Sequence, residues 1–291
     1  MEVLRLDGPL DETLREPVLA LALDGWTDAG RAGSLAAETI RHQWLATRIG
    51  GFAGDRLFDY RDRRPILTID RGILGDPEWP ALDLYQVAPI AGRPLLLVEG
   101  AEPDLGWRAL CADVVELAQM VGARRYVGLG AVPAPAPHTR TTRLITTGSS
   151  ESAFERYGRP HERLTVPASC QVVVETALRD AGLETIGLWA RVPHYIAGEY
   201  PDGAMALVRA LAEEVGAEVD LSELAEAAEE HRQRLDQAAA SSQDIVAHIR
   251  QLEDVYDTDL AAESGFGALP TGDEIAAELE RFLRRQGGGD R

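Results

Sequence analysis

The sequence contains neither lysine nor asparagine, and arginine therefore supplies all 29 of its positive side chains. Without lysine, the chain lacks the amine nucleophile of Schiff-base and pyridoxal-phosphate enzymes, and the residue with which a P-loop reaches the β- and γ-phosphates. Without asparagine, it has no acceptor for N-linked glycosylation. These absences exclude those enzyme classes and a secreted N-glycoprotein. Both amino acids have A-rich codons, so a GC-rich genome accounts for their absence.

Positive charge is also scarce relative to negative charge. The chain of 291 residues has 48 acidic side chains, which give a net charge of −19 and a pI near 4.7. Duplex nucleic acid and anionic membranes attract basic surfaces, so we expect neither of them as a partner. A hydrophobic content of 45% with 26% charged residues is typical of a globular protein.

Cysteine is rare, and the two cysteines, Cys111 and Cys170, form no CxxC motif. We expect them to be reduced structural thiols, as is usual in the cytosol. No run approaches 18 uncharged apolar residues, and the first ten residues carry acidic side chains in place of the apolar centre of a signal peptide. The sequence therefore predicts a cytoplasmic protein without a membrane-spanning segment.

Apolar, strand-like runs alternate with helix-like segments over the first 216 residues. This alternation is typical of βαβ crossovers, and the uniformly apolar strands indicate a sheet that is covered on both faces. We predict a three-layer α/β core domain over residues 1–216. The expected strands lie at 17–23, 64–69, 85–88, 95–99, 126–132, 144–147 and 183–190, and the expected helices at 31–47, 104–122, 167–181 and 201–216.

The composition changes after residue 216, where acidic residues crowd together and strand signals end. We predict a helical C-terminal region at 217–286 and a disordered tail at 287–291. Apolar residues in this region recur in alternating steps of three and four, which is typical of a coiled-coil seam. The seam includes Leu221, Leu224, Leu235, Ile245, Ile249, Leu252 and Tyr256.

Two questions about this seam stay open at the level of sequence. A single helix over 221–256 would be roughly 50 Å long, whereas the capping pattern SSQD at 241–244 favours two helices. The seam either packs on the core of the same chain or joins two copies. A loop at 260–272 and an amphipathic helix at 273–285 complete the expected C-terminal region.

Three motifs follow predicted strands, at the position where open α/β sheets place their ligands. The first motif, DGWTDAG at 24–30, contains Asp24, Trp26 and Asp28 and leads from a strand into a helix. Backbone N–H groups at such a helix start can bind an anion, although the glycine spacing is not that of a dinucleotide-binding fingerprint. Helix N-capping by Thr27 or Asp28 is the alternative interpretation.

The second motif, PHTRTTR at 137–143, contains His138, Thr139 and Arg140, and the third, VPHY at 192–195, contains His194 and Tyr195. Arginine and hydroxyl groups can bind a phosphate or another oxyanion, and two converging histidines could serve acid–base catalysis. Alternatively, the basic residues form ion pairs with acidic neighbours or hold a subunit contact, and the histidine is buried beside its tyrosine. No metal-binding spacing is present, so we expect no metal and no cofactor.

Six motifs, taken in order, resemble those of the proteasome assembly chaperone 2 family in its actinobacterial form. They are DGWTDAG at 24–30, EPD at 102–104 with Trp107, PHTR at 137–140, VPAS at 166–169, VPHY at 192–195 with Tyr200, and LEDVYD at 252–257. The resemblance implies a phosphorylase/hydrolase-like α/β sandwich with a C-terminal helical appendage, often assembled as a homo-oligomer such as a trimer. It implies no agreed enzyme activity.

The resemblance also bears on the C-terminus. Relatives that act in proteasome assembly commonly end in a hydrophobic residue, tyrosine and any residue, whereas this sequence ends in GGDR. We therefore do not expect its C-terminus to insert into a proteasome ring.

Two functions are compatible with these features. The first is a non-enzymatic protein-interaction or assembly-chaperone-like role, with further copies of the chain and proteasome subunits as partners. The seam, the resemblance and the lack of a recognisable catalytic set favour it. The alternative is an enzyme or sensor for a small anionic ligand, phosphate- or nucleoside-like, bound where the loops of Asp24, His138 and His194 meet.

Overall fold

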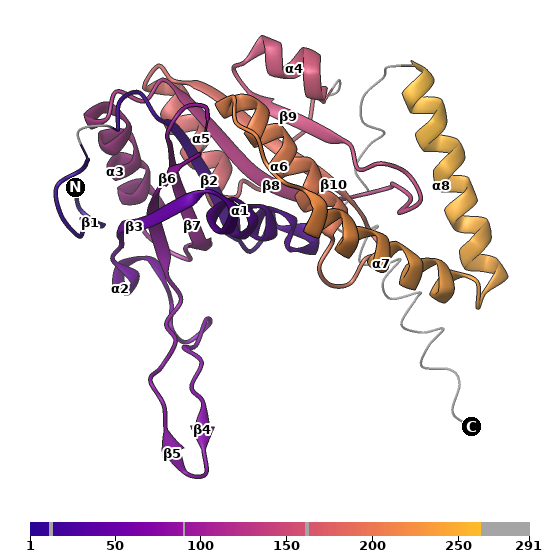
Figure 1. Ribbon diagram of the computed structural model, residues 1–291, viewed down its shortest axis with the longest axis horizontal. Coiled ribbons are helices and arrows are strands. Elements are labelled where there is room, and N and C mark those ends of the chain that lie inside the picture. Colours follow the sequence, from indigo (N-terminus) through magenta and orange to yellow (C-terminus); the bar gives the residue numbers. More distant parts are fainter. Residues whose placement is uncertain (12–13, 90, 161–162, 263–291) are drawn as a thin grey trace.

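The computed structural model describes residues 1–11, 14–89, 91–160 and 163–262, and its centre is a mixed sheet of eight strands (Figure 1). Across the sheet the strands follow the order β1-β3-β6-β7-β2-β8-β10-β9. Their bounds, in that order, are Leu4–Leu6, Leu45–Phe52, Leu82–Ala88, Leu95–Ala101, Val18–Asp24, Arg125–Ala134, Glu184–Pro193 and Leu144–Gly148.

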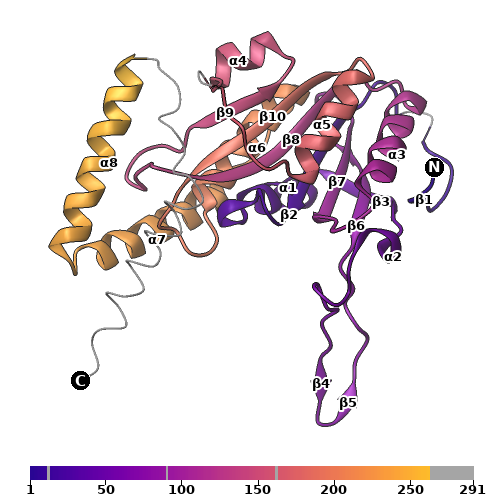
Figure 2. The same cartoon turned by 180° about the vertical axis from the view of Figure 1, so that it is seen from behind.

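The four central strands, β7, β2, β8 and β10, are parallel, and the strands on both sides of them are antiparallel to their neighbours. Parallel neighbours require crossover connections, which helices supply on the faces of the sheet. Helices α1 (Ala32–Gln43) and α6 (Pro201–Val215) cover one face, and α3 (Trp107–Met120) and α5 (Cys170–Asp180) cover the other (Figures 1 and 2). The predicted three-layer α/β fold is confirmed.

The buried strand β2 shows how the sequence builds these layers. All of its residues from 18 to 23 are buried, because both faces of a central strand are covered. Side chains alternate along a strand, so residues 18, 20 and 22 pack on the side of α1 and α6, and residues 19, 21 and 23 pack on the side of α3 and α5. Val18, Ala20 and Ala22 are smaller than the leucines on the opposite face.

After α6 the chain forms two helices, α7 (Ser222–Ala239) and α8 (Gln243–Ala262), separated by a turn at 240–242 (Figure 2). The structure therefore has two helices where the sequence left one or two open. Most of the predicted loop at 260–272, the helix at 273–285 and the tail at 287–291 lie outside the described residues. Over the described part of the chain, none of the helices has the length and apolar character needed to cross a membrane.

The prediction of a helix through residue 47 is wrong, because α1 ends at Gln43 and β3 begins at Leu45. Trp44 already has an extended backbone, with φ −99° and ψ 151°. Only the last three residues of β3 are buried. The strand therefore lacks the apolar run that would identify it, and its alanine and threonine continue the pattern of the helix.

The segment expected as a core strand at 64–69 belongs instead to a hairpin arm that projects from the sheet (Figures 1 and 2). Its strands are β4 (Ile69–Asp70) and β5 (Ile73–Leu74). The two turn residues, Arg71 and Gly72, have φ of 50° and 85°, the positive values that a type I′ hairpin turn needs. The arm leads directly into β6, whose first residue lies beside the carboxyl end of β7.

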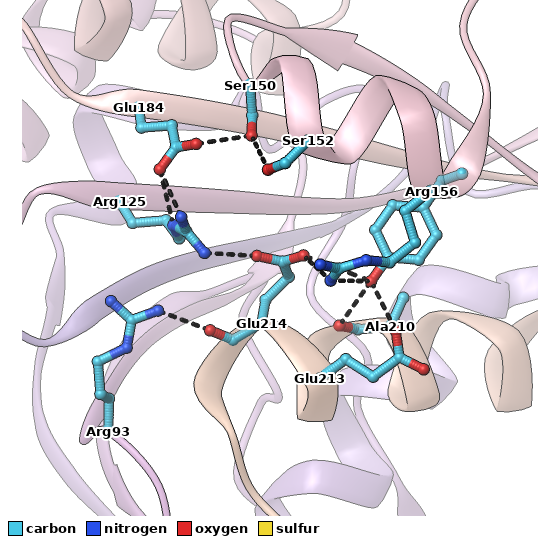
Figure 3. A network of polar contacts seen from close by, with 10 residues as sticks. Arg93, Arg125, Ser150, Ser152, Arg156, Glu184, Ala210, Glu213 and Glu214 are labelled. Carbon is cyan, nitrogen blue, oxygen red and sulfur yellow. Dashed lines mark hydrogen bonds and ion pairs between the residues drawn. The ribbon is translucent and has the colours of Figure 1, made fainter.

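A polar network fixes the C-terminal end of α6 at the amino ends of β8 and β10 (Figure 3). The carboxylate of Glu214, with 4% of its side chain exposed, accepts Arg125 Nη1 at 2.7 Å and Arg156 Nη1 at 2.9 Å. Arg125 Nη2 also lies 2.6 Å from the carboxylate of Glu184. Arg93 Nη2 donates to the backbone carbonyl of Glu214 at 2.7 Å. Cations near the last carbonyls of a helix stabilise its C-terminus.

Candidate functional site at the carboxyl edge of the sheet

The loops that follow the four parallel strands meet at one edge of the sheet, which we call the carboxyl edge. These loops cover residues 25–30 after β2, 102–106 after β7, 135–143 after β8 and 194–200 after β10. The candidate ligand-binding residues lie at this edge, as the sequence predicts; they are Asp24, Trp26, Asp28, His138, Thr139, Arg140, His194 and Tyr195.

In the turn after β2, the carboxylate of Asp28 binds the first turn of α1, whose N-cap position is Arg31. The Asp28 side chain is buried, and Oδ1 accepts a hydrogen bond from the N–H of Gly33 at 2.7 Å, while Oδ2 accepts one from the hydroxyl of Ser34 at 2.5 Å. Burial raises the pKa of Asp28, and the hydrogen bonds from Ser34 and Gly33 oppose that shift. These contacts occupy the N–H groups that an anion would use, so they favour a structural role of Asp28 at the helix start over anion binding.

A second carboxylate, that of Glu102, fills the space between this turn and the start of α5. Its Oε2 accepts the N–H of Trp26 at 2.9 Å, and its Oε1 accepts the N–H of Cys170 at 2.8 Å. Position 25 requires glycine, because a Cβ at Gly25 would lie 2.8 Å from the Glu102 side chain. The starts of α1 and α5, where an anion would bind, therefore already hold carboxylates of the chain. The side chains of Asp24 and Trp26 stay exposed.

His138 is 2% exposed, and its backbone N–H and both ring nitrogens have hydrogen-bond partners. The hydroxyl of Tyr195 accepts the backbone N–H of His138 at 2.8 Å and lies 2.7 Å from the ring Nδ1. The hydroxyl of Tyr195 keeps its own proton for donation to Nδ1. In that tautomer Nε2 carries the ring proton and donates it to the carboxylate of Asp236 of α7 at 3.2 Å. Burial raises the pKa of Tyr195 to about 12, which keeps the hydroxyl protonated for this role.

Thr139 and Arg140 hold α8. Arg140 Nη1 lies 3.0 Å from Glu253, and its Nε and Nη2 donate to the two carboxylate oxygens of Asp257 at 3.0 and 2.8 Å. The hydroxyl of Thr139 donates to the same carboxylate of Glu253. Residues 137–143, which we call the basic loop, thus form ion pairs with acidic neighbours in the same chain, one of the two interpretations that the sequence left open.

His194 lies beside this cluster and contacts α8 as well. Its ring packs edge-on against Tyr195 at 5.4 Å and against His248 of α8 at 5.6 Å, and its Nδ1 is 3.3 Å from the carbonyl oxygen of Ala134. His138 and His194 therefore converge through contacts with the same tyrosine. Within the residues that the structure describes, no group of three His, Cys, Asp or Glu side chains is placed to hold a metal ion.

The seam residues of α7 and α8 mostly face their own chain. Four of them are buried within one copy, namely Leu224, Ile249, Leu252 and Tyr256. Leu221 and Leu235 are half-buried, and Ile245 is 42% exposed. Leu224 joins the core, and the three α8 residues are buried elsewhere within the same copy, so this distribution favours packing within the chain over a seam between two copies.

Sequence reasoning did not select the acidic partners of this site. Glu102 lies in a recognised motif, but its contacts reach Trp26 and Cys170, far away in sequence. Glu253 and Asp257 also lie in a recognised motif, LEDVYD at 252–257, and their spacing of four residues places them on one face of α8, which could have indicated a docking face. Asp236 carries no such signal, because α7 is acidic along its length.

The fold and the site define an α/β sandwich protein whose carboxyl edge binds its own C-terminal helices. The chain belongs to the PAC2 family, whose model matches residues 22–239. This match confirms the family resemblance seen in the sequence motifs.

Solved structures of actinobacterial proteins share this fold. Rv2714 of Mycobacterium tuberculosis, a protein of unknown function, is 33% identical, with a TM-score of 0.83 over 89% of this chain and 92% of that one. A Corynebacterium glutamicum protein of unknown function is 30% identical, with a TM-score of 0.84 over 90% and 100%. Rv2125 of Mycobacterium tuberculosis, a proteasome-assembly chaperone homologue, is 27% identical, with a TM-score of 0.74 over 80% and 99%. No curated protein matches this chain significantly.

Proposed function

We propose that this protein is a non-enzymatic, assembly-chaperone-like protein that binds other proteins. Membership of the PAC2 family and 27% identity to a proteasome-assembly chaperone homologue support this role. The hairpin arm carries the proposal, because it presents apolar side chains that its own chain leaves uncovered. The alternative of a small-anion enzyme or sensor has no such support, since carboxylates of the chain occupy the two helix starts at the carboxyl edge.

The arm is apolar and electrically balanced. Leu67, Ile69 and Leu74 share one face, because side chains alternate along a strand and Ile69 pairs with Leu74; they are 40, 60 and 67% exposed. Residues 61–79 contain four arginines and four acidic residues, whereas the whole chain has a charge of −19. The arm can therefore approach a second, acidic copy of the chain without the electrostatic repulsion that the acidic surfaces of two copies exert on each other. Contiguous exposed apolar surface of this kind marks protein contacts.

We expect the chain to form a homo-oligomer, such as a trimer, through this arm. The substitutions Ile69→Asp and Leu74→Asp together should weaken self-association at least about tenfold, because they place two charges in an apolar contact. Light scattering after size-exclusion chromatography measures the change. Leu45→Asp is the matched control, since Leu45 is 76% exposed but lies at the end of β3 that is remote from the arm. An unchanged mass of the arm variant, or a monomeric wild type, would contradict this contact.

We also propose proteasome subunits as partners, in the cytoplasm. The two cysteines are free and buried, which suits a reducing compartment. Recombinant proteasome α subunits mixed with the full chain at micromolar concentration are expected to give a complex by native mass spectrometry. Bovine serum albumin serves as the acidic control protein. The absence of a complex with the α subunits would exclude this partner and would leave self-association as a separate question.

A further inference from the structure

We infer that the basic loop is a receptor for an acidic helix of a partner protein, and that α8 is the helix that the chain itself supplies to this receptor. The inference deepens the proposed protein-binding role by naming the chemistry of the partner. It rests on the contacts that hold α8: a few side chains of the basic loop bind residues on one face of this helix.

The apolar part of these contacts lies on α8. Ile249, Leu252 and Tyr256 are 8, 6 and 7% exposed, and their spacing of three and four places them on one face of the helix. A groove that binds an amphipathic helix uses anchors at this spacing. The opposite face is open, since Gln251, Asp254 and Thr258 are exposed.

Polar contacts next to those anchors involve the carboxylates and the tyrosine hydroxyl of α8. Glu253 and Asp257 face Arg140, and Glu253 also accepts the hydroxyl of Thr139. The hydroxyl of Tyr256 donates to the backbone carbonyl of residue 141. The guanidinium of Arg143 lies over the ring of the same tyrosine, 5.8 Å from its centroid. The preferred ligand is therefore an amphipathic helix with the pattern I-x-x-L-E-x-x-Y-D.

The attachment of α8 to the rest of the chain allows a helix of a partner protein to replace it on the basic loop. The helix is joined to α7 by a turn of three residues, and its ion pairs with Arg140 are partly exposed, with 35% of the Arg140 side chain and 53% of the Asp257 side chain accessible. Exposed ion pairs contribute little to stability. The tether gives α8 an effective concentration on the order of millimolar. A partner helix therefore binds well only when α8 is released, and release uncovers two arginines that attract acidic segments.

The test uses the full chain with α8 released by charge reversal, as Glu253→Arg together with Asp257→Arg. The probe is a fluorescein-labelled peptide with the sequence of residues 243–262, and anisotropy reports its binding. We expect the released variant to bind the peptide at least about tenfold more tightly than the wild type does, because the tethered competitor is gone. Adding Arg140→Ala to the released variant should weaken binding at least about tenfold, without restoring an ion pair to the released α8, and Tyr256→Ala in the peptide should weaken it as well.

Two outcomes would overturn the inference. These are equal binding by the wild type and the released variant, and equal binding of a peptide with the same residues in shuffled order. Circular dichroism checks the fold, and full-length Tyr256→Ala offers a second way to loosen α8 without reversing charge. Peptide binding can succeed or fail whether or not proteasome subunits bind, so the two proposals fail separately.

Discussion

Replacement of Glu214 by alanine is expected to lower the free energy of unfolding by about 3 kcal/mol. The carboxylate is buried between Arg125 and Arg156 (Figure 3), and its removal leaves the inner guanidinium without one of its two carboxylates. Breaking a buried ion pair from one side costs roughly 3–5 kcal/mol because the remaining charge stays desolvated. Urea unfolding followed by circular dichroism measures the loss.

Glu213 supplies the matched control for this prediction. It is the preceding residue of α6, its side chain is exposed, and its carboxylate accepts a hydrogen bond from Tyr157 at 3.0 Å. Glu213→Ala should change the stability by less than about 0.5 kcal/mol, as is usual for an exposed position. Equal losses for the two variants would mean that the buried network does not hold the end of α6. Glu214→Gln, which keeps the shape, should fall between the two.

The fold could be predicted where burial leaves a complete pattern in the sequence. Strand β2 has six consecutive buried residues, and the sequence predicts it to within one residue at each end. Strand β3 could not be recognised, because it pairs near the outside of the sheet and buries only its last three residues. Residues 64–69 have the aliphatic composition of a core strand, and no local signal shows that the arm leaves both of its faces uncovered.

The site could be predicted in its location but not in its partners. Parallel strands place their carboxyl ends at one edge, so strand order alone brings the loops of Asp28, His138 and His194 to the same side of the sheet. The partners of His138 and Thr139 are Asp236 and Glu253, which lie 98 and 114 residues further along the chain. Both α7 and α8 carry several other acidic residues, and only the packing of these helices determines which of the acids contact the basic loop.

Glu175 on α5 has a different environment from the paired carboxylates, and it makes stability depend on pH. The residue is 5% exposed, and Oε2 accepts the hydroxyl of Thr147 at 3.1 Å, while that hydroxyl oxygen accepts Trp189 Nε1 at 2.9 Å. Burial raises the pKa of Glu175 to about 7, against smaller opposing effects of Thr147 and Arg179. A carboxylate without a buried cation beside it is the group that burial penalises most.

Glu175→Gln is therefore expected to stabilise the protein at high pH and to have a smaller effect at low pH. The ordinary pKa of 4.5 applies to the unfolded chain, so the folded state holds the proton more tightly and unfolding releases it. The contribution of Glu175 to stability is therefore greatest below pH 4.5 and falls as the pH rises through about 7, by at most about 3 kcal/mol. Glutamine keeps the size of the side chain and cannot ionise. Urea unfolding should show its advantage growing by about 2 kcal/mol between pH 5.5 and pH 8.

Glu155→Gln separates this effect from a general change in charge. Glu155 lies on α4 (Glu151–Tyr157) with its side chain exposed, so the substitution removes the same charge without relieving a buried carboxylate. Its stability difference from the wild type should stay constant over the same pH range. A constant difference for Glu175→Gln as well would mean that Glu175 ionises as readily in the folded protein as in the unfolded chain. A growing difference for Glu175→Gln alone would locate the pH dependence in the layer between α5 and the sheet.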